Sequence, residues 1–536
     1  MRLPPAFASR GGGGKGNMMT NTKLFVALLA GSILATATPA FAQTPATDPT
    51  PEAQPDPSDA AANAAIAAAQ PVDAAAAQVQ LLSEQVQALQ AQLDQMKKDM
   101  VKATPTWKGA PEFADKDAGF TFKPKGFMQF DAGYVGFPDG NERRGTIGGL
   151  NYQNLGFNTR ARRLVFGAEG SLPGGFKYKA EFNFAQGTVD YEDILLSYDF
   201  KNSPLTVTVG NFYPFSSLDT VTSSRLGSFL ERASFTDGFN YNRRLGIALS
   251  LADKVADRYT LSAGVFSEPI NDTGFKRTGW EASARGTFTP HMGSGFIHLG
   301  ASAHLRQNTR EAQGATYRSR PLTQVTDQRF VDTGAIAAKG DYSVGLELGG
   351  VFHSFHFAAE AQKLWVAHAF DTTTVAFSDP TTNDNFTGLR YNGNPSFEGG
   401  YAEVGYYFTG ESRGYKGGKW DRTKVLHPFN DGGWGAFQAN ARVDYINLTD
   451  QVGGTPLATT GYQSGSSSRY VNGGKQLGYQ ASLIWNPMDY LRFMAQVGRV
   501  DVDGGPRAAF VDATGVANPR RKYHVDTAAV RAQVEF

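Results

Sequence analysis

Arginine and lysine recur on the polar side of segments whose alternate positions are apolar. Arg442 lies on that side of "AFQANARVDY" (436–445), and Arg492 does so in "LRFMAQV" (491–497). A guanidinium group donates two parallel hydrogen bonds in one plane, which matches the oxygens of carboxylate and phosphate. Rows of such groups around water select anions by attraction and by replacing lost hydration. The residue pattern therefore predicts a surface that prefers anions.

Three other segments resemble catalytic or metal-binding motifs, but each lacks the structural surroundings that its motif requires. "GESRG" (410–414) fits the nucleophile elbow of hydrolases, but that motif needs a following helix, which "YKGGKWD" (415–421) cannot start. "HSFH" (353–356) puts its two histidines on opposite faces of a strand, and "DVDGG" (501–505) lacks the rest of an EF-hand loop. The chain has no cysteine. We therefore predict no enzyme, no cofactor and no metal site.

Composition narrows the class of protein. The 536 residues include 51 basic and 50 acidic side chains, a net charge of +1 that argues against a general nucleic-acid binder. Aromatic residues make up 12% of the chain, while mean hydropathy is only −0.34. No apolar run of membrane-spanning length follows the first 45 residues, which excludes a helical membrane protein.

The N-terminal segment carries a secretion signal. Lys23 precedes the apolar stretch "LFVALLAGSILA", and "AFAQ" supplies an A-x-A cleavage site after Ala42. We expect residues 1–42 to be a signal peptide whose true start is Met18 or Met19. A membrane anchor is the alternative, but its apolar core would be short.

Residues 43–118 divide into three further parts. Residues 43–71 are rich in Pro, Ala and Asp and predict a disordered linker. Residues 72–104 predict a coiled-coil helix, and residues 105–118 a second linker. The apolar positions of the helix recur at alternating steps of three and four, as in a heptad seam: Val79, Leu82, Val86, Leu89, Leu93, Met96 and Met100. Val and Leu in these positions lean toward two strands, and a single amphipathic helix on a domain surface is the alternative.

From residue 119 to residue 536 the pattern changes to alternation at period two. In "FKYKAEFNF" (176–184) one face is aromatic and the other is charged. The apolar faces are rich in Ala, Gly, Phe and Tyr with aromatics near strand ends, which is typical of a lipid-facing band with interfacial girdles. Since sheet edges are not tolerated in lipid, such a sheet has to close. We predict an all-β fold, a transmembrane antiparallel up-and-down β-barrel, rather than a secreted sandwich or adhesin.

Several blocks in this region resemble the phosphate-selective porin O and P family. They include "RARRLVFGAEGSLPGGFKYKAEFNFA", "LTVTVGNFYPF", "YYFTGESRGYK" and "GGWGAFQANARVDYINLTD". The resemblance implies about sixteen strands, a homotrimer in the outer membrane of a Gram-negative bacterium, and passage of anions such as phosphate or polyphosphate. It places the N-terminal segment in the periplasm, and it implies contacts with outer-membrane lipid, lipopolysaccharide and the barrel assembly machinery.

Strand counting locates a constriction. We expect strands near 126–136, 158–170, 175–186, 190–200 and 204–212, with long loops at one end of the barrel and short turns at the other. The connection 214–242 is then the third long loop, and a barrel of porin width can hold it in its lumen. The phosphate-selective members are expected to have lysines at their constriction, but 214–242 contains none.

Strand phase and the 214–242 loop together give the predicted pore-lining residues. They are Arg163, Lys177, Lys179, Arg225, Arg232, Arg244, Arg285, Arg306, Arg442, Arg492 and Arg531. Each could instead be solvated or paired with a neighbouring carboxylate, because the two signs nearly balance across the barrel segment.

The last six residues, "RAQVEF", continue a strand and end on Phe536. In a closed barrel the last strand pairs with the first, and a final Phe after alternating apolar residues resembles the assembly signal of outer-membrane barrels. The sequence thus predicts a passive channel for small hydrophilic solutes that prefers anions. The alternatives are a structural or adhesive barrel that uses the coiled coil as an envelope tether, and a carbohydrate porin, which would need aromatics along the lumen.

Overall fold

The computed structural model describes residues 72–536 except 104, 108, 116, 139–145, 148–149, 152–153, 271–278, 309–314, 380–383, 391–393, 452–469, 506–509, 512–516 and 519–521. The predicted signal peptide (1–42) and first linker (43–71) lie outside the described residues. The chain divides into two units, residues 1–90 and 91–536.

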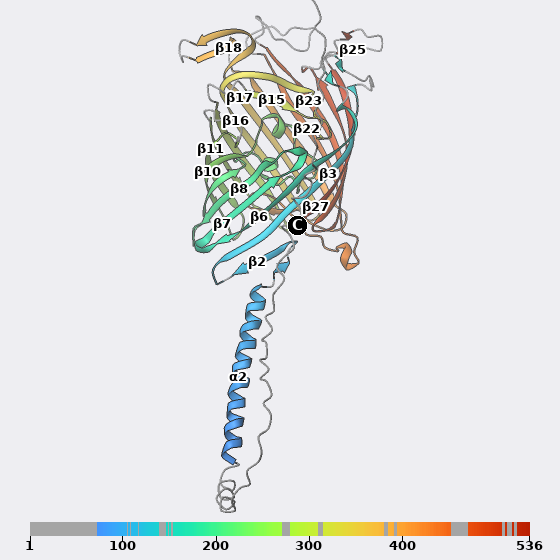
Figure 1. Cartoon of the computed structure of the whole chain (residues 1–536). Helices are drawn as coiled ribbons and strands as arrows, with labels where there is room; N and C mark the ends of the chain where they lie inside the picture. The colour runs from blue at the N-terminus through green and yellow to red at the C-terminus, as the bar shows by residue number, and fades with distance from the viewer. Residues whose placement is uncertain are drawn as a thin grey trace, which may run out of the picture. The chain divides into compact units, whose positions relative to one another are not determined.

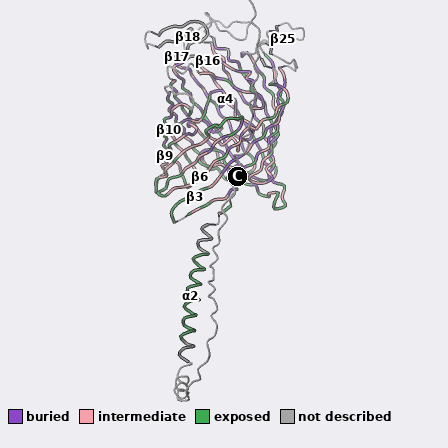
Figure 2. Tube along the Cα trace, viewed as in Figure 1, coloured by how far each residue is buried: buried purple, intermediate pink, exposed green. Residues whose placement is uncertain are grey.

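The segment predicted as a coiled coil forms one helix, α2 (Val72–Ala103), shown in blue in Figure 1. Much of this helix is exposed in the single chain, as the green of α2 in Figure 2 shows. The exposed residues include the seam positions Val79, Leu82, Val86, Leu89, Leu93 and Met96. Pairing of this seam with another helix stays a prediction. Among the described residues, no helix is long and apolar enough to cross a membrane.

Sixteen antiparallel strands form a closed barrel, in which each strand pairs with the next and the last, β27, pairs with the first, β3. They are β3 (Phe120–Val135), β6 (Gly156–Leu172), β7 (Phe176–Asn183), β8 (Asp190–Asp199), β9 (Leu205–Phe212), β10 (Arg244–Ala252), β11 (Tyr259–Ser267), β12 (Trp280–Phe288), β14 (Gly295–Gln307), β16 (Val331–Phe352), β17 (Phe355–Asp379), β19 (Ser396–Tyr407), β22 (Ala436–Gln451), β23 (Tyr470–Met488), β24 (Leu491–Asp503) and β27 (Lys522–Glu535). The closed barrel of the prediction is confirmed (Figure 1).

The period-two pattern orients every strand. On β22 the side chain of Val443 faces outward and is 45% exposed, whereas its neighbour Arg442 faces the lumen and is 4% exposed. The same contrast separates Val530 from Arg531 on β27. Apolar side chains thus face the lipid while charged ones face inward, where they are shielded from it.

The shorter elements lie in the connections and next to the first barrel strand. They are β1 (Thr106–Trp107), β2 (Pro111–Asp115), β4 (Thr146–Ile147), β5 (Leu150–Asn151), η3 (Pro173–Gly175), η4 (Ala185–Gly187), α3 (Leu218–Val221), α4 (Ser234–Gly238), β13 (His291–Met292), β15 (Ala315–Ser319), β18 (Asp384–Arg390), β20 (Gly414–Lys416), β21 (Lys419–Asp421), η5 (Phe429–Asp431), β25 (Phe510–Val511) and β26 (Ala517–Asn518). Strands β1 and β2 fall inside the segment 105–118, which the sequence predicted to be a linker. Strand β2 pairs with the start of β3, so it covers an edge that lies beyond the end of β27.

The two ends of the barrel differ as the sequence predicted, with one exception. Short turns such as 173–175 and 353–354 alternate with longer connections such as 213–243. The connection 408–435, however, joins β19 to β22 at the short-turn end and is long. We call it the 408–435 insert. Its hairpin β20–β21 contains Trp420, which is buried inside the barrel.

Part of the lumen is filled by an apolar core. The 214–242 loop and a second infolded segment, residues 320–330, bring apolar side chains against inward-facing residues of the wall. The cluster includes Leu218, Phe235, Phe239, Leu322, Val325 and Phe330 from the two segments and Phe397, Ile446, Val500 and Val525 from the strands. The strand residues of this cluster are apolar and still face inward, because the infolded segments and not water pack against them.

Replacement of Phe235 by Ala tests this packing. Phe235 is fully buried in the lumen core, so Phe235→Ala should lower the free energy of unfolding by about 3–5 kcal/mol. The measurement is the temperature at which the folded barrel converts to its unfolded form on a denaturing gel. Phe493→Ala is the control, because Phe493 is 39% exposed on the lipid face. An equal drop in both variants would contradict a packed lumen core.

Candidate functional site

The 214–242 loop crosses the lumen and is held there by side chains of the opposite wall. The backbone N–H groups of Leu218 and Asp219, at the start of α3, donate to the carboxylate of Glu360 on β17 at 3.0 and 2.7 Å. The N–H of Ser234, at the start of α4, donates to Asp444 on β22 at 2.9 Å. Helix starts have no intrahelical acceptors for these N–H groups. The strand carboxylates therefore accept the hydrogen bonds of these N–H groups and fix the position of the loop.

Arginines on the strands hold the carbonyl groups of the infolded segments. Arg492 donates to the backbone oxygens of Arg225 and Gly227 at 2.9 and 2.7 Å. Four other arginines each pair with a strand carboxylate and also donate to a carbonyl of an infolded segment: Arg531 (Asp131 and Leu230), Arg442 (Glu403 and Glu231), Arg306 (Asp341 and Phe239) and Arg285 (Glu347 and Gly418). These side chains are anchors of the loops as well as charges of the lumen.

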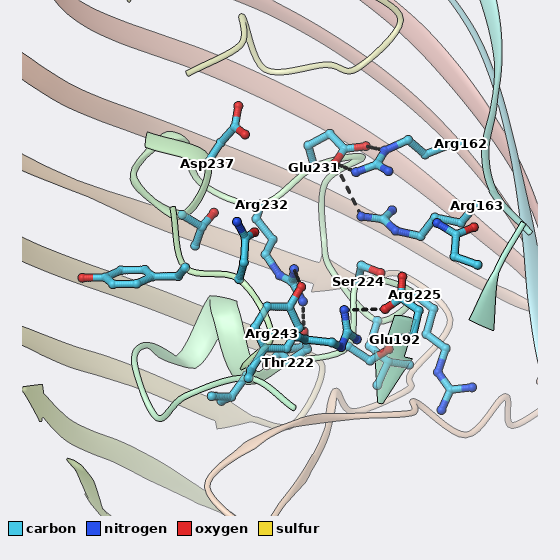
Figure 3. Close-up of a pocket in the computed structure, with 18 of the residues that line it drawn as sticks. Arg162, Arg163, Glu192, Thr222, Ser224, Arg225, Glu231, Arg232, Asp237 and Arg243 are labelled. Carbon is cyan, nitrogen blue, oxygen red and sulfur yellow. Dashed lines mark hydrogen bonds and ion pairs between the residues drawn. The ribbon is translucent and has the colours of Figure 1, made fainter. Parts of the chain in front are cut away.

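A β-bulge on β6 turns two consecutive arginines toward the lumen. Arg163 pairs with Gln129 and Ala161 with the next residue of β3, so Arg162 is the extra residue between them. Arg162 donates to both carboxylate oxygens of Glu231 on the 214–242 loop at 2.8 and 2.9 Å, and Arg163 approaches the same carboxylate at 3.8 Å (Figure 3). Burial favours a raised pKa for Glu231, but these guanidinium groups outweigh it and hold that pKa well below its usual range.

A second β-bulge, on β8, turns two consecutive carboxylates toward the lumen. Glu192 and Asp193 together oppose Glu181 of β7, and both contact Arg243 at the end of the 214–242 loop. The Arg243 guanidinium lies 4.2 Å from the ring centre of Tyr213, which marks the start of that loop. The two bulges thus carry opposite charges and bind the loop at separate points.

A cavity, which we call the main cavity, lies between the loop and this wall. It has a volume of about 450 Å³ and lies against β6, β7 and β8, the 214–242 loop, the 320–330 segment and the tip of the 408–435 insert. Its charged lining residues are Arg162, Arg163, Lys179, Glu181, Asp190, Glu192, Asp193, Arg225, Glu231, Arg232, Asp237, Arg243, Arg320, Lys419 and Asp421. A second, smaller cavity at the short-turn end shares Arg225, Leu226 and Asp421 with the first and also includes Arg492.

The hairpin of the 408–435 insert brings a lysine to this cavity. Gly417 and Gly418 both have positive φ (61° and 74°) and form the two-residue turn between β20 and β21. The carbonyl of Gly418 accepts from Arg285 at 2.8 Å, which fixes the tip. Lys419, the next residue, is exposed on the cavity. It forms no ion pair with any described residue.

Comparison with known proteins agrees with this architecture. The family model for phosphate-selective porins O and P matches residues 146–536. The chain belongs to the phosphate-selective porin O and P family. An uncharacterized protein of Caulobacter vibrioides is 35% identical over 441 residues, which cover 80% of this chain and 77% of that protein. Porin O of Pseudomonas aeruginosa is 25% identical over 362 residues, or 64% of this chain and 76% of Porin O. Membership of this family supports an outer-membrane channel.

Similar solved structures are more distant in sequence. The outer-membrane channel DcaP of Acinetobacter baumannii is 13% identical with a TM-score of 0.39, over 78% of this chain and 98% of DcaP. An anion-selective porin of Comamonas acidovorans is 10% identical with a TM-score of 0.39, over 77% of this chain and 99% of that porin.

The residues predicted to line the pore of this porin fall into two groups. Those on the two cavities are Arg163, Lys179, Arg225, Arg232 and Arg492, while Arg442 lines a small space beside the main cavity. Those outside the cavity linings are Lys177, Arg244, Arg285, Arg306 and Arg531. Within the second group Lys177 pairs with Asp199, Arg244 pairs with Glu281, and the other three hold infolded segments.

The sequence analysis missed four basic residues of the cavity: Arg162, Arg243, Arg320 and Lys419. Strict alternation assigns Arg162 to the lipid face, and only the bulge brings it inward. Lys419 belongs to a connection at the short-turn end, where long infolded segments were not expected. The Gly-Gly pair before it is a hairpin signal that could have indicated the turn.

Glu360→Ala tests how the 214–242 loop is held. Two buried loop N–H groups would lose their acceptor, each at a cost of about 1–3 kcal/mol. We expect unchanged assembly, a noisier open-channel current in planar bilayers, and faster proteolysis within 214–242. Glu398→Ala is the control, because Glu398 pairs with the part-exposed Lys363 outside the lumen core. A quiet current and intact loop in Glu360→Ala would show that the carboxylate does not hold the loop.

Proposed function

We propose that this porin passes small hydrophilic solutes by diffusion and prefers anions, phosphate or polyphosphate among them. The observation that carries the proposal is a set of cationic groups on the two cavities that form no ion pair with a carboxylate among the described residues. Arg232 donates only to backbone oxygens and to Tyr213, and Arg492 only to backbone oxygens. Lys419 is the third. Such groups can attract an anion without first breaking an ion pair.

The expected preference is mild. Asp190 and Asp421 on the main cavity and Asp489 on the second cavity also form no ion pair among the described residues, and most other charges there are paired. The unpaired cations therefore do not outnumber the unpaired carboxylates, and the preference depends on where these groups lie and not on their number. The family description and the relationship to Porin O support phosphate as one of the solutes. Lys419 supplies the primary amine that the 214–242 loop lacks.

We also propose that the porin is a homotrimer with its N-terminal segment in the periplasm. The exposed heptad seam of α2 supports assembly, because an apolar stripe of this kind is stable in water when another helix covers it. Phe536 is proposed as the signal for the barrel assembly machinery. Its backbone N–H and carbonyl both pair with Gly126, and its ring lies 5.8 Å from that of Phe166 at the rim.

Reversal potentials in a potassium chloride gradient test the ion preference. The wild-type channel should prefer chloride, and Lys419→Gln should shift the reversal potential toward that of a non-selective pore, since it removes one unpaired cation. Lys254→Gln is the control, because Lys254 lies in a short turn, pairs with Asp199 and does not line either cavity. A wild-type preference for potassium would contradict the proposal.

A further inference from the structure

Glu231 is a loop carboxylate surrounded by three guanidinium groups. Arg162 binds both of its oxygens, Arg531 donates to one of them at 2.8 Å, and Arg163 lies 3.8 Å from the other. Figure 3 shows Arg162 and Arg163 directed toward this one side chain from the barrel wall. The paired donation from Arg162 is the geometry with which arginine binds a carboxylate or phosphate ligand.

The charges around Glu231 do not balance locally. Arg531 has a second carboxylate partner, Asp131, at 2.6 Å. Arg162 and Arg163 have no carboxylate partner other than Glu231 among the described residues, and Arg163 otherwise donates to the neutral side chain of Gln129. Three guanidinium groups thus share two carboxylates, and the bulge on β6 is the cause, because it adds Arg162 to the inward face.

The arginines and the carboxylate come from different parts of the chain. The guanidinium groups stand on the rigid wall, on β6 and β27, whereas Glu231 is delivered by the 214–242 loop. All of Arg162, Arg163 and Glu231 line the 450 Å³ cavity, so a solute in the cavity can reach them. The carboxylate of Glu231 therefore lies where a bound anion would lie, against the arginines of the wall.

We propose that the wall arginines form an oxyanion-binding site and that Glu231 is a tethered competitor that occupies it. This inference rests on the proposed anion channel. It also explains why an anion that binds in the channel does not stay there. A tethered group competes at a high effective concentration, so a passing anion binds the arginines weakly and leaves quickly. Conduction needs binding that is favourable enough for entry and weak enough for exit. The ligand class is a small anion with at least two oxygens, such as phosphate or a carboxylate.

Block of the chloride current by inorganic phosphate tests the proposal. Glu231→Gln removes the competing charge and keeps the side-chain size, so the half-blocking phosphate concentration should fall at least about tenfold, or about 1.4 kcal/mol at 25 °C. Asp237→Asn is the matched control. It removes a carboxylate from the same loop and the same cavity, but the partners of Asp237 are Arg320 and Arg329 and not the bulge arginines. The control should stay within about twofold of wild type, which is well under one charge-assisted hydrogen bond.

Acetate provides a second test, because it is the group that Glu231→Ala removes. Acetate should block Glu231→Ala at a lower concentration than it blocks wild type, while Asp237→Asn should not differ from wild type. Equal phosphate block in Glu231→Gln and Asp237→Asn would overturn the proposal. So would failure of both Glu231 variants to form heat-resistant barrels, because Glu231 would then be a required counter-ion. A wild-type preference for potassium would refute only the anion channel, since the comparison between the two variants would still decide the site.

Discussion

The structure depends on arginines that each bind two partners, a carboxylate on the barrel wall and a backbone carbonyl on an infolded segment. Arg531 is the clearest case. Asp131 accepts from it at 2.6 and 2.7 Å and Leu230 at 2.6 Å, and its side chain is fully buried. A buried guanidinium is costly unless its charge and its five N–H groups are satisfied. The wall carboxylate neutralises the positive charge of the guanidinium, and the loop supplies the remaining hydrogen-bond acceptors. The infolded loop and the buried arginine therefore each require the other.

This arrangement divides the lumen. On one side, aromatic and aliphatic side chains of the loops pack against inward-facing apolar residues such as Ile446 and Val500. On the other side, β6, β7 and β8 face the open cavity with charged residues from two bulges. The main cavity thus lies against the charged wall of β6, β7 and β8, and the second cavity lies at the short-turn end against β22, β23 and β24. The proposed preference for anions rests on the cations of the two cavities that form no ion pair among the described residues, which are Arg232, Arg492 and Lys419.

Much of the fold could be predicted from the sequence, because a closed barrel imposes a period of two on every strand. The strands near 126–136 and 158–170 are present, and 214–242 is the infolded loop as predicted. The site was less predictable for physical reasons. A bulge shifts the phase by one residue and turns Arg162 inward, and no local signal in "RARR" announces it. Lys419 reaches the cavity only through tertiary packing of its hairpin. The inward-facing apolar residues Val500 and Val502 did carry a signal, since an aqueous lumen gives no reason for them.

Side chains of the wall hold the 214–242 loop as firmly as strands hold one another. Hydrogen exchange of the purified porin in lipid nanodiscs measures this directly. The amides of Leu218, Leu230 and Ser234 donate to Glu360, Gln496 and Asp444. Peptides that contain them should exchange as slowly as peptides from β23 and β24. Exchange of these amides at the rate of an exposed loop, while the strands stay protected, would show that the wall does not hold the loop.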